Sequence, residues 1–208
     1  ASLTWAFAGV LNPAMSQLHA FVSEYSARDQ PWRYLFQTTD VIMGTLLCLA
    51  GLATLVWARH RPLGRQGWSG VGFVAGGFFS VLDALVTMDC SPTRSQACMA
   101  AEEAGHVSVN HIVHVGTSTI VVVGFALPIL LLNSTMTRFR GFGLVVTWAW
   151  VVFTLLNGIG AVGWFVGTPM DYTGIWQRFS LGLGTLWWLI LAADDIVTAR
   201  VQDRARSC

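Results

Sequence analysis

Histidine and aspartate side chains beside apolar segments are the residues of this sequence that could carry chemistry. His111 and His114 stand where a long apolar run begins, and Asp83 lies near the end of the preceding apolar run. Imidazole and carboxylate groups are the ligands that zinc prefers in catalytic sites, where a water fills the open position. Without a metal the same groups could carry protons, because histidine titrates near neutral pH. The two histidines could equally be only hydrogen-bonded residues at the start of a helix.

Other polar residues are expected at a similar depth in the apolar runs. Asp40 lies near the start of one run, Ser80 precedes Asp83 by almost one helical turn, and Arg178 opens the last run. Ionisable groups are costly in lipid, so we expect them to face the protein interior and one another. The sequence therefore predicts an outward-facing polar cavity whose catalytic or zinc-binding residues would be Asp83, His111 and His114, and whose further binding residues would be Asp40, Ser80, Arg178 and Glu24.

Apolar helices must position these side chains. The chain has 208 residues, of which 54% are hydrophobic and only 11% are charged, whereas a soluble domain has about 25% charged residues. Several apolar runs are long enough to cross a bilayer. The sequence predicts an all-α, polytopic membrane helix bundle that forms one integral domain over residues 1–208, with spans at 35–57, 69–87, 108–132, 143–166 and 175–193.

Residues 1–22 do not fit this pattern as clearly. The pair Asn12-Pro13 interrupts them, and the first ten residues are too few to span a bilayer. We interpret them as the tail of a first, incomplete or irregular span followed by an interfacial segment. This interpretation gives six spans.

Arginine positions indicate the orientation of the bundle. By the rule that basic loops stay inside, the side with more arginines is cytoplasmic, which places the tail 199–208 inside and the loop 88–107 outside. Cys90 and Cys98 lie in that outer loop, where disulfides persist, so we expect them to pair. The side assigned to the cytoplasm has eight arginines: Arg59, Arg61, Arg65, Arg138, Arg140, Arg200, Arg204 and Arg206. The outer side has four: Arg28, Arg33, Arg94 and Arg178.

Two stretches resemble a known family. They are "FVSEYSARDQPWRYLFQTTDVIMG" at 21–44 and "FSVLDALVTMDCSPTRSQACMAAEEAGHVSVNHIVHVGTSTI" at 79–120, and they are similar to the bacterial six-span membrane family called domain of unknown function 998. This resemblance implies a fold and topology but no activity. A looser similarity is to the alkaline ceramidase and adiponectin-receptor superfamily of zinc hydrolases, although the last span here lacks that superfamily's paired histidines.

The sequence leaves three functions open. The first is a small membrane protein of the bacterial cell envelope that binds a lipid or a partner membrane protein in an accessory role. The second is a membrane-embedded lipid hydrolase or transferase at the extracytoplasmic leaflet, with zinc as a candidate cofactor. The third is a small transporter. Nucleic acid is not an expected partner, because the arginines are spread over short loops and do not form a patch.

Overall fold

Five long helices dominate the computed structural model, which describes residues 4–59, 64–165 and 172–207. Each is long and apolar enough to cross a membrane, so the predicted five clear spans and the all-α membrane bundle are confirmed. They are α2 (Arg33–Ala58), α3 (Arg65–Leu85), α5 (Val109–Leu132), α6 (Arg140–Phe165) and α7 (Thr173–Ser207).

Short helices make up the rest of the regular structure. They are η1 (Thr4–Phe7), α1 (Ala8–Leu11), η2 (Val22–Ser26) and α4 (Gln96–Glu103). The described residues before α2 hold nothing long enough to span, so the predicted sixth span is not confirmed. The predicted tail 199–208 continues α7 to Ser207, and Cys208 and Arg61 lie outside the described residues.

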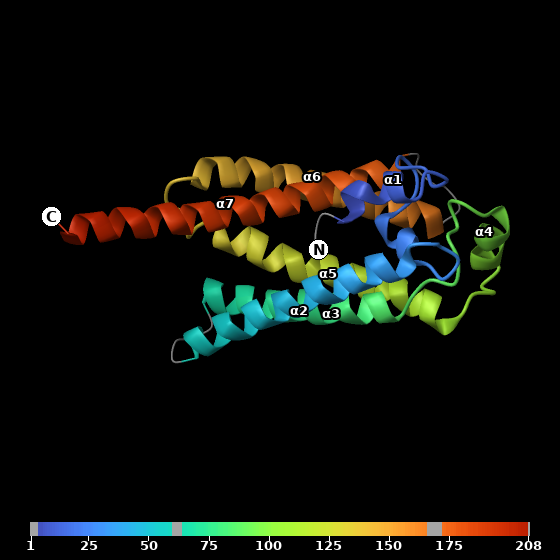
Figure 1. The fold of residues 1–208 in the computed structure, drawn as a ribbon, viewed down its shortest axis with the longest axis horizontal. Coiled ribbons are helices and arrows are strands. Elements are labelled where there is room, and N and C mark those ends of the chain that lie inside the picture. Colours follow the sequence, from blue (N-terminus) through green and yellow to red (C-terminus); the bar gives the residue numbers. More distant parts are fainter. Residues whose placement is uncertain (1–3, 60–63, 166–171, 208) are drawn as a thin grey trace.

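Glycines let α2, α3 and α5 pack closely. A Cβ atom on Gly77 of α3 would lie 2.5 Å from the carbonyl oxygen of Gly44 on α2, and one on Gly124 of α5 would lie 2.5 Å from the Cα of Gly76. Backbones can approach this closely only at such small residues, as is typical of membrane helices. The three helices therefore form one tight group, with α6 and α7 beside it as a hairpin (Figure 1).

Buried side chains close the end of the bundle that leads to the C-terminus. Asp194 of α7 accepts hydrogen bonds from the backbone N–H groups of Thr137, Arg138 and Phe139, at 2.9, 2.7 and 2.8 Å, just before α6 begins. These bonds satisfy backbone donors at the N-terminus of α6 that have no partner within the helix. An apolar cluster joins α5 to the hairpin there, formed by Ile129, Met136, Val146, Trp150, Trp187 and Ile190.

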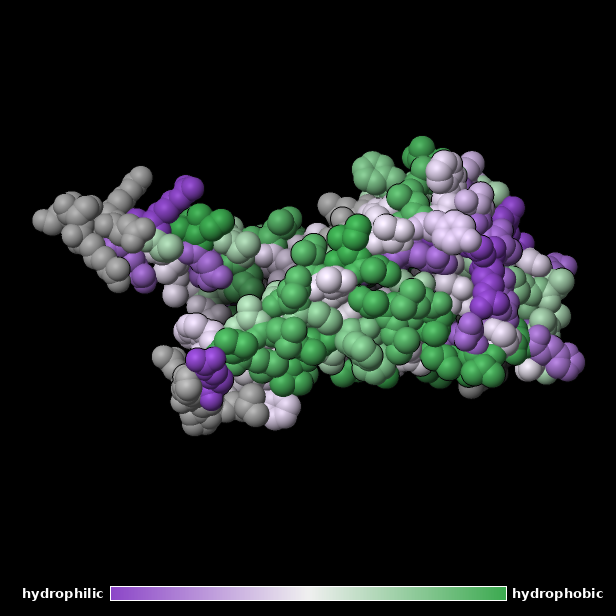
Figure 2. Space-filling view, turned by 60° about the horizontal axis from the view of Figure 1, so that its bottom comes forward, coloured by the Kyte–Doolittle hydropathy of each residue, from purple (hydrophilic) through white to green (hydrophobic). Residues whose placement is uncertain are grey.

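The opposite end is covered by two segments, residues 4–32 and 86–108, which we call the cap. Figure 1 shows α1 and α4 together at this end, away from the C-terminus. In Figure 2, hydrophilic side chains gather at the cap end while hydrophobic ones cover the flank of the bundle. An apolar belt between two polar ends is the surface that a bilayer requires.

A disulfide holds the second cap segment. Cys90 and Cys98 are bonded, with 6.0 Å between their Cα atoms, in agreement with the predicted pairing. The bonded loop contains Ser91 and Thr93, and α4 begins inside it with Ser95 as its N-cap residue, whose hydroxyl accepts the N–H of Cys98 at 3.2 Å.

Removing this disulfide should destabilise the protein. The two cysteines are eight residues apart, and closing a loop of this size restricts the unfolded chain by about 2–3 kcal/mol. We expect Cys98→Ser to lower the melting temperature in detergent and to make it insensitive to reductant. Cys48→Ser is the control, because Cys48 is a free cysteine on α2. A Cys98→Ser protein that melts with the wild type would contradict this prediction.

Candidate functional site

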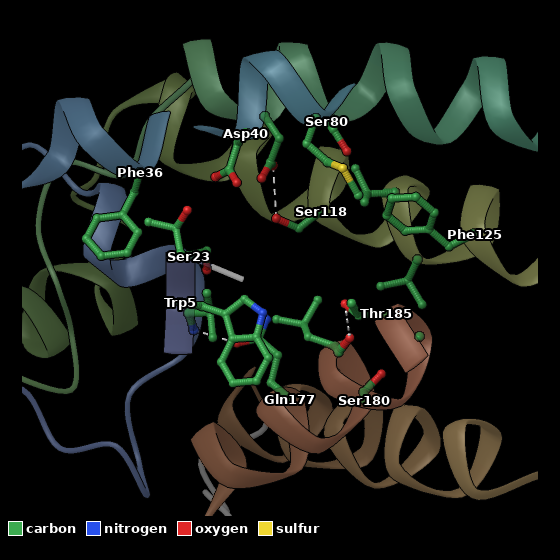
Figure 3. Close-up of a pocket in the computed structure, with 18 of the residues that line it drawn as sticks. Trp5, Ser23, Phe36, Asp40, Ser80, Ser118, Phe125, Gln177, Ser180 and Thr185 are labelled. Carbon is green, nitrogen blue, oxygen red and sulfur yellow. Dashed lines mark hydrogen bonds between the residues drawn. The ribbon is translucent and has the colours of Figure 1, made fainter. Parts of the chain in front are cut away.

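A cavity of about 220 Å³ lies between the α2–α3–α5 group and α7, beneath the cap (Figure 3). One wall is polar and comes from three helices: Asp40 from α2, Ser80 and Asp83 from α3, and Ser118 from α5. Apolar side chains continue this wall below the polar groups, namely Met43, Val121, Val122, Phe125 and Ile129. The cavity therefore has a polar region and an apolar region.

Asp83 is held in place by α5. Its Oδ1 atom accepts the hydroxyls of Thr117 and Ser118, the latter at 2.9 Å, and lies 3.3 Å from the Nδ1 atom of His114. The Asp40 carboxyl differs, because no described residue donates a hydrogen bond to it and its side chain is exposed to the cavity. One carboxyl is thus fixed by the protein, and the other is open to a ligand.

The second wall is a stripe of α7. Gln177, Ser180, Leu181, Gly184, Thr185 and Trp188 all line the cavity. Their spacing of three, four, seven, eight and eleven residues puts them on one helix face. Sequence reasoning missed this wall, although its signal was present: three of the six are polar residues on a single face of an apolar helix. Trp150 of α6 completes the wall.

The cap forms the roof. Thr4, Trp5, Val22 and Ser23 line the cavity from above, and the N–H of Val22 donates to the Oε1 atom of Gln177 at 2.5 Å. The indole N–H of Trp5 is buried and has no acceptor among the described residues. Figure 3 shows Trp5 on the side of the cavity opposite Asp40. The roof thus brings an unused donor to the site.

Glu24 does not line the cavity, although it follows two roof residues. Its side chain is fully buried within the cap. One carboxylate oxygen accepts the N–H of Phe21 at 2.8 Å, and the other accepts the hydroxyl of Ser91 and both the N–H and the hydroxyl of Thr93. Burial raises the pKa of Glu24, although these hydrogen bonds act in the opposite direction. Glu24 therefore joins the two cap segments next to the roof.

Arg178 also lies outside the cavity lining. Its guanidinium donates to the carbonyl oxygens of Ala20 and Gly174, at 2.8 and 2.9 Å, and to the side chains of Gln17 and Tyr25. These bonds fasten the N-terminal cap segment to the start of α7. The expected cavity residue Arg178 thus binds the cap, and it is not among the residues that line the cavity.

His111, in the first turn of α5, is buried against the cap and does not line the cavity. Its Nδ1 atom accepts the N–H of Asp89 at 3.3 Å, so the neutral ring carries its proton on Nε2. That Nε2 atom lies 3.9 Å from a carboxylate oxygen of Glu102. The imidazole thus links the start of α5 to the loop that contains the disulfide.

His114 binds the end of α3. Its Nδ1 atom lies 3.1 and 3.0 Å from the carbonyl oxygens of Asp83 and Val86, which are acceptors, so Nδ1 carries the proton. The ring thereby satisfies carbonyl groups at the C-terminus of α3 that have no partner within the helix. Both imidazoles bind backbone groups, and neither is among the residues that line the cavity. Of the seven predicted site residues, Asp40, Ser80 and Asp83 reach it.

The predicted zinc ligands do not gather into a metal site. Among residues 4–59, 64–165 and 172–207, no group of three or more histidine, cysteine, aspartate or glutamate side chains is close enough to hold a metal ion. Asp83 and His114 approach each other, but the ring nitrogens of His111 face Asp89 and Glu102. The donor set therefore does not fit a zinc ion with three protein ligands.

Asp89 organises the start of α5. Its carboxylate accepts the N–H and the hydroxyl of Ser108, the N-cap residue of α5, at 2.7 and 2.8 Å, and Arg28 lies 3.4 Å away. Burial acts to raise the pKa of Asp89, but these hydrogen bonds and the charges of Arg28 and His111 outweigh it, so the pKa lies below its usual value.

We expect Asp89→Ala to lower the free energy of unfolding by about 1–2 kcal/mol, because it leaves the Ser108 donors without an acceptor. Arg28→Ala should change it by less than about 1 kcal/mol, because the ion pair is solvent-exposed. Since folding lowers the pKa of Asp89, its stabilising effect is present above the unfolded pKa and is lost as the pH falls through the folded pKa. Denaturation curves at several pH values measure both effects; equal losses in the two variants would contradict this assignment.

Five spanning helices and an apolar belt define this chain as a multi-pass helical membrane protein. The family model described as "Protein of unknown function (DUF998)" matches residues 1–194, so the chain belongs to that family. This confirms the stronger of the two resemblances found in the sequence; nothing supports the looser similarity to the alkaline ceramidases. Neither the curated proteins nor the solved structures contain a significant match.

Proposed function

We propose that this chain is a bacterial plasma-membrane protein that binds the polar end of an amphiphilic bilayer molecule in the cavity beneath the cap. The observation that carries the proposal is the composition of the cavity wall. Carboxyl, hydroxyl and amide groups of Asp40, Ser118 and Gln177 line the same space as apolar side chains such as Val122 and Phe125. A lipid-like molecule has the same two kinds of surface, and most ligand sites combine apolar walls with a few polar groups.

The proposed orientation places the cap outside the cell and the C-terminus in the cytoplasm. Its support is the arginine distribution, because the residues that flank the spans at the end opposite the cap include Arg59, Arg65 and Arg140. A disulfide in the cap is compatible with an oxidising, extracytoplasmic compartment.

An accessory role without catalysis fits the site better than the alternatives. The histidines expected to catalyse hydrolysis bind backbone groups outside the cavity lining. A transporter needs a path to the other side, whereas the apolar cluster around Trp187 joins α5 to α6 and α7 at the end of the bundle opposite the cap. We therefore propose neither a hydrolase nor a transporter.

Filling the cavity tests this function. Val122 lines it and Val123 does not, although the two are neighbours on α5 with side chains 37% and 58% exposed. We expect Val122→Trp to reduce the amount of amphiphile that co-purifies with the full-length gene product about tenfold, a change equal to ~1.4 kcal/mol of binding. Native mass spectrometry of the protein released from detergent measures this amount.

Val123→Trp is the matched control and should retain the bound amphiphile. Equal retention by both variants would contradict the proposal. So would an experimental structure of the full-length gene product in which protein side chains fill the cavity.

A further inference from the structure

We infer that the amphiphile bound in this cavity carries a positively charged amine, seated beside Asp40 and Asp83. This inference rests on the proposed binding function and names the chemical class of the ligand. It follows from the charge of the cavity wall, from a carboxyl in that wall to which no described residue donates a hydrogen bond, and from the aromatic side chains around it.

The described lining residues carry acidic groups and no basic ones. Asp40 and Asp83 are both present, and none of the described residues that line the cavity is arginine, lysine or histidine. The basic side chains near the lining are bound to backbone carbonyl oxygens: His114, 3.3 Å from Asp83, to those of Asp83 and Val86, and Arg178 to those of Ala20 and Gly174. The described lining residues therefore supply no counter-charge to the two aspartates, and a cationic ligand would supply one.

The position of Asp40 makes such a ligand favourable. Asp40 lies seven residues after the start of α2, which is about 10 Å along a helix. No described residue donates a hydrogen bond to its carboxyl, whereas the Asp83 carboxyl accepts two hydroxyl groups. A carboxyl within the membrane is costly unless it is paired. An ammonium group between the two aspartates would pair Asp40 through charge-assisted hydrogen bonds.

Aromatic side chains surround the same space. Trp5, Phe36, Phe125, Trp150 and Trp188 line the cavity. Cations are attracted to the faces of aromatic rings, most strongly to tryptophan. The buried indole N–H of Trp5 lacks an acceptor among the described residues, so it is free to bind an oxygen atom next to the amine. A lipid headgroup that ends in an amine and contains ester, hydroxyl or phosphate oxygens has both features.

Three probes of matched structure test this inference. Dodecylamine carries the charge and a chain, dodecanol carries the chain alone, and butylamine carries the charge with a short chain. We expect the full-length protein in maltoside micelles to bind dodecylamine at least tenfold more tightly than either of the others, as measured by calorimetric titration and by the rise in melting temperature. Butylamine binding as tightly as dodecylamine would overturn the assignment to a lipid and indicate a free amine.

Variants then assign the charge to its partner. Asp40→Asn is chosen because the Asp40 carboxyl supports no described hydrogen bond, so the substitution leaves the fold's bonds intact. It should weaken dodecylamine binding about tenfold and leave dodecanol binding unchanged. Asp195→Asn, at an exposed carboxyl of α7 outside the cavity, is the control and should change neither.

The outcomes separate this inference from the proposed function. If dodecanol binds as tightly as dodecylamine, or if Asp40→Asn does not weaken amine binding, the inference of a positively charged ligand is wrong. The proposed binding of an amphiphile would still stand. If no probe binds and Val122→Trp has no effect on co-purified amphiphile, both fail.

Discussion

Replacing Gly124 by alanine is expected to lower the free energy of unfolding by about 3 kcal/mol. A Cβ atom at this position would lie 2.5 Å from both the Cα and the N atoms of Gly76. These are backbone atoms of α3, so no side-chain rotation can relieve the contact, and the two helices must separate. Separation would also weaken the bonds from Thr117 and Ser118 to Asp83, because those bonds cross the same interface.

Gly116 supplies a control on the same helix. A Cβ atom there would meet nothing within 4 Å, and alanine has at least as high a helix propensity as glycine. We therefore expect Gly116→Ala to unfold like the wild type, or slightly later, when both variants are compared by thermal unfolding in detergent. Similar melting temperatures for Gly124→Ala and Gly116→Ala would show that α3 and α5 do not pack as closely as described.

Removing the Glu24 carboxylate should also lower the free energy of unfolding by about 3 kcal/mol. Glu24→Ala would leave the hydroxyl of Ser91 and the N–H groups of Phe21 and Thr93 without their acceptor inside the cap. Each unsatisfied buried group costs about 1–3 kcal/mol. Glu103→Ala is the control, because Glu103 is an exposed glutamate of α4 in the same cap. Urea unfolding that gives equal losses for both variants would contradict this role of Glu24.

The pH dependence of Glu24 has a definite sign. Burial raises its pKa in the folded protein above the ordinary value of 4.5, so the folded state keeps this proton to a higher pH than the unfolded chain. The stability linked to Glu24 is therefore complete below the unfolded pKa and is lost as the pH rises through the folded pKa. We expect the wild type to show this loss as the pH rises above the ordinary glutamate pKa of 4.5, and we expect no such loss in Glu24→Gln. If the free energy of unfolding varies with pH in the same way in the wild type and in Glu24→Gln, Glu24 is not the group responsible.

Hydropathy predicted the spans because bilayer thickness constrains each helix separately. Nine of the ten predicted span edges fall within four residues of a helix end, whereas the last span, predicted to end at 193, continues as α7 to Ser207. The disulfide followed from two cysteines in a loop that the arginine count placed outside. Asp40 and Asp83 were singled out because charged groups avoid lipid, and together with Ser80 they line the cavity.

Long-range contacts explain what the sequence did not predict. Polarity alone does not distinguish a side chain that faces a cavity from one that binds backbone, and His114 binds the carbonyl oxygens of α3, 28 and 31 residues earlier in the chain. Arg178 has partners 153 to 161 residues away in the cap. Such contacts depend on how two helices pack against each other, and the spacing of residues along one helix does not reveal that packing.

The contacts of the cap determine the order in which the molecule can be completed. Residues 17–25 leave the ribosome before α7 does. The hydrogen bonds of Val22 with Gln177 and of Ala20 with Arg178 can form only after those two residues of α7 have been synthesised. The partners of Glu24 lie 67 and 69 residues downstream. The first cap segment is therefore synthesised before its partners on α7 and can complete these contacts only after α7 has been made. A nascent chain stalled before Gln177 should expose this segment to protease, and release of the full-length chain should protect it.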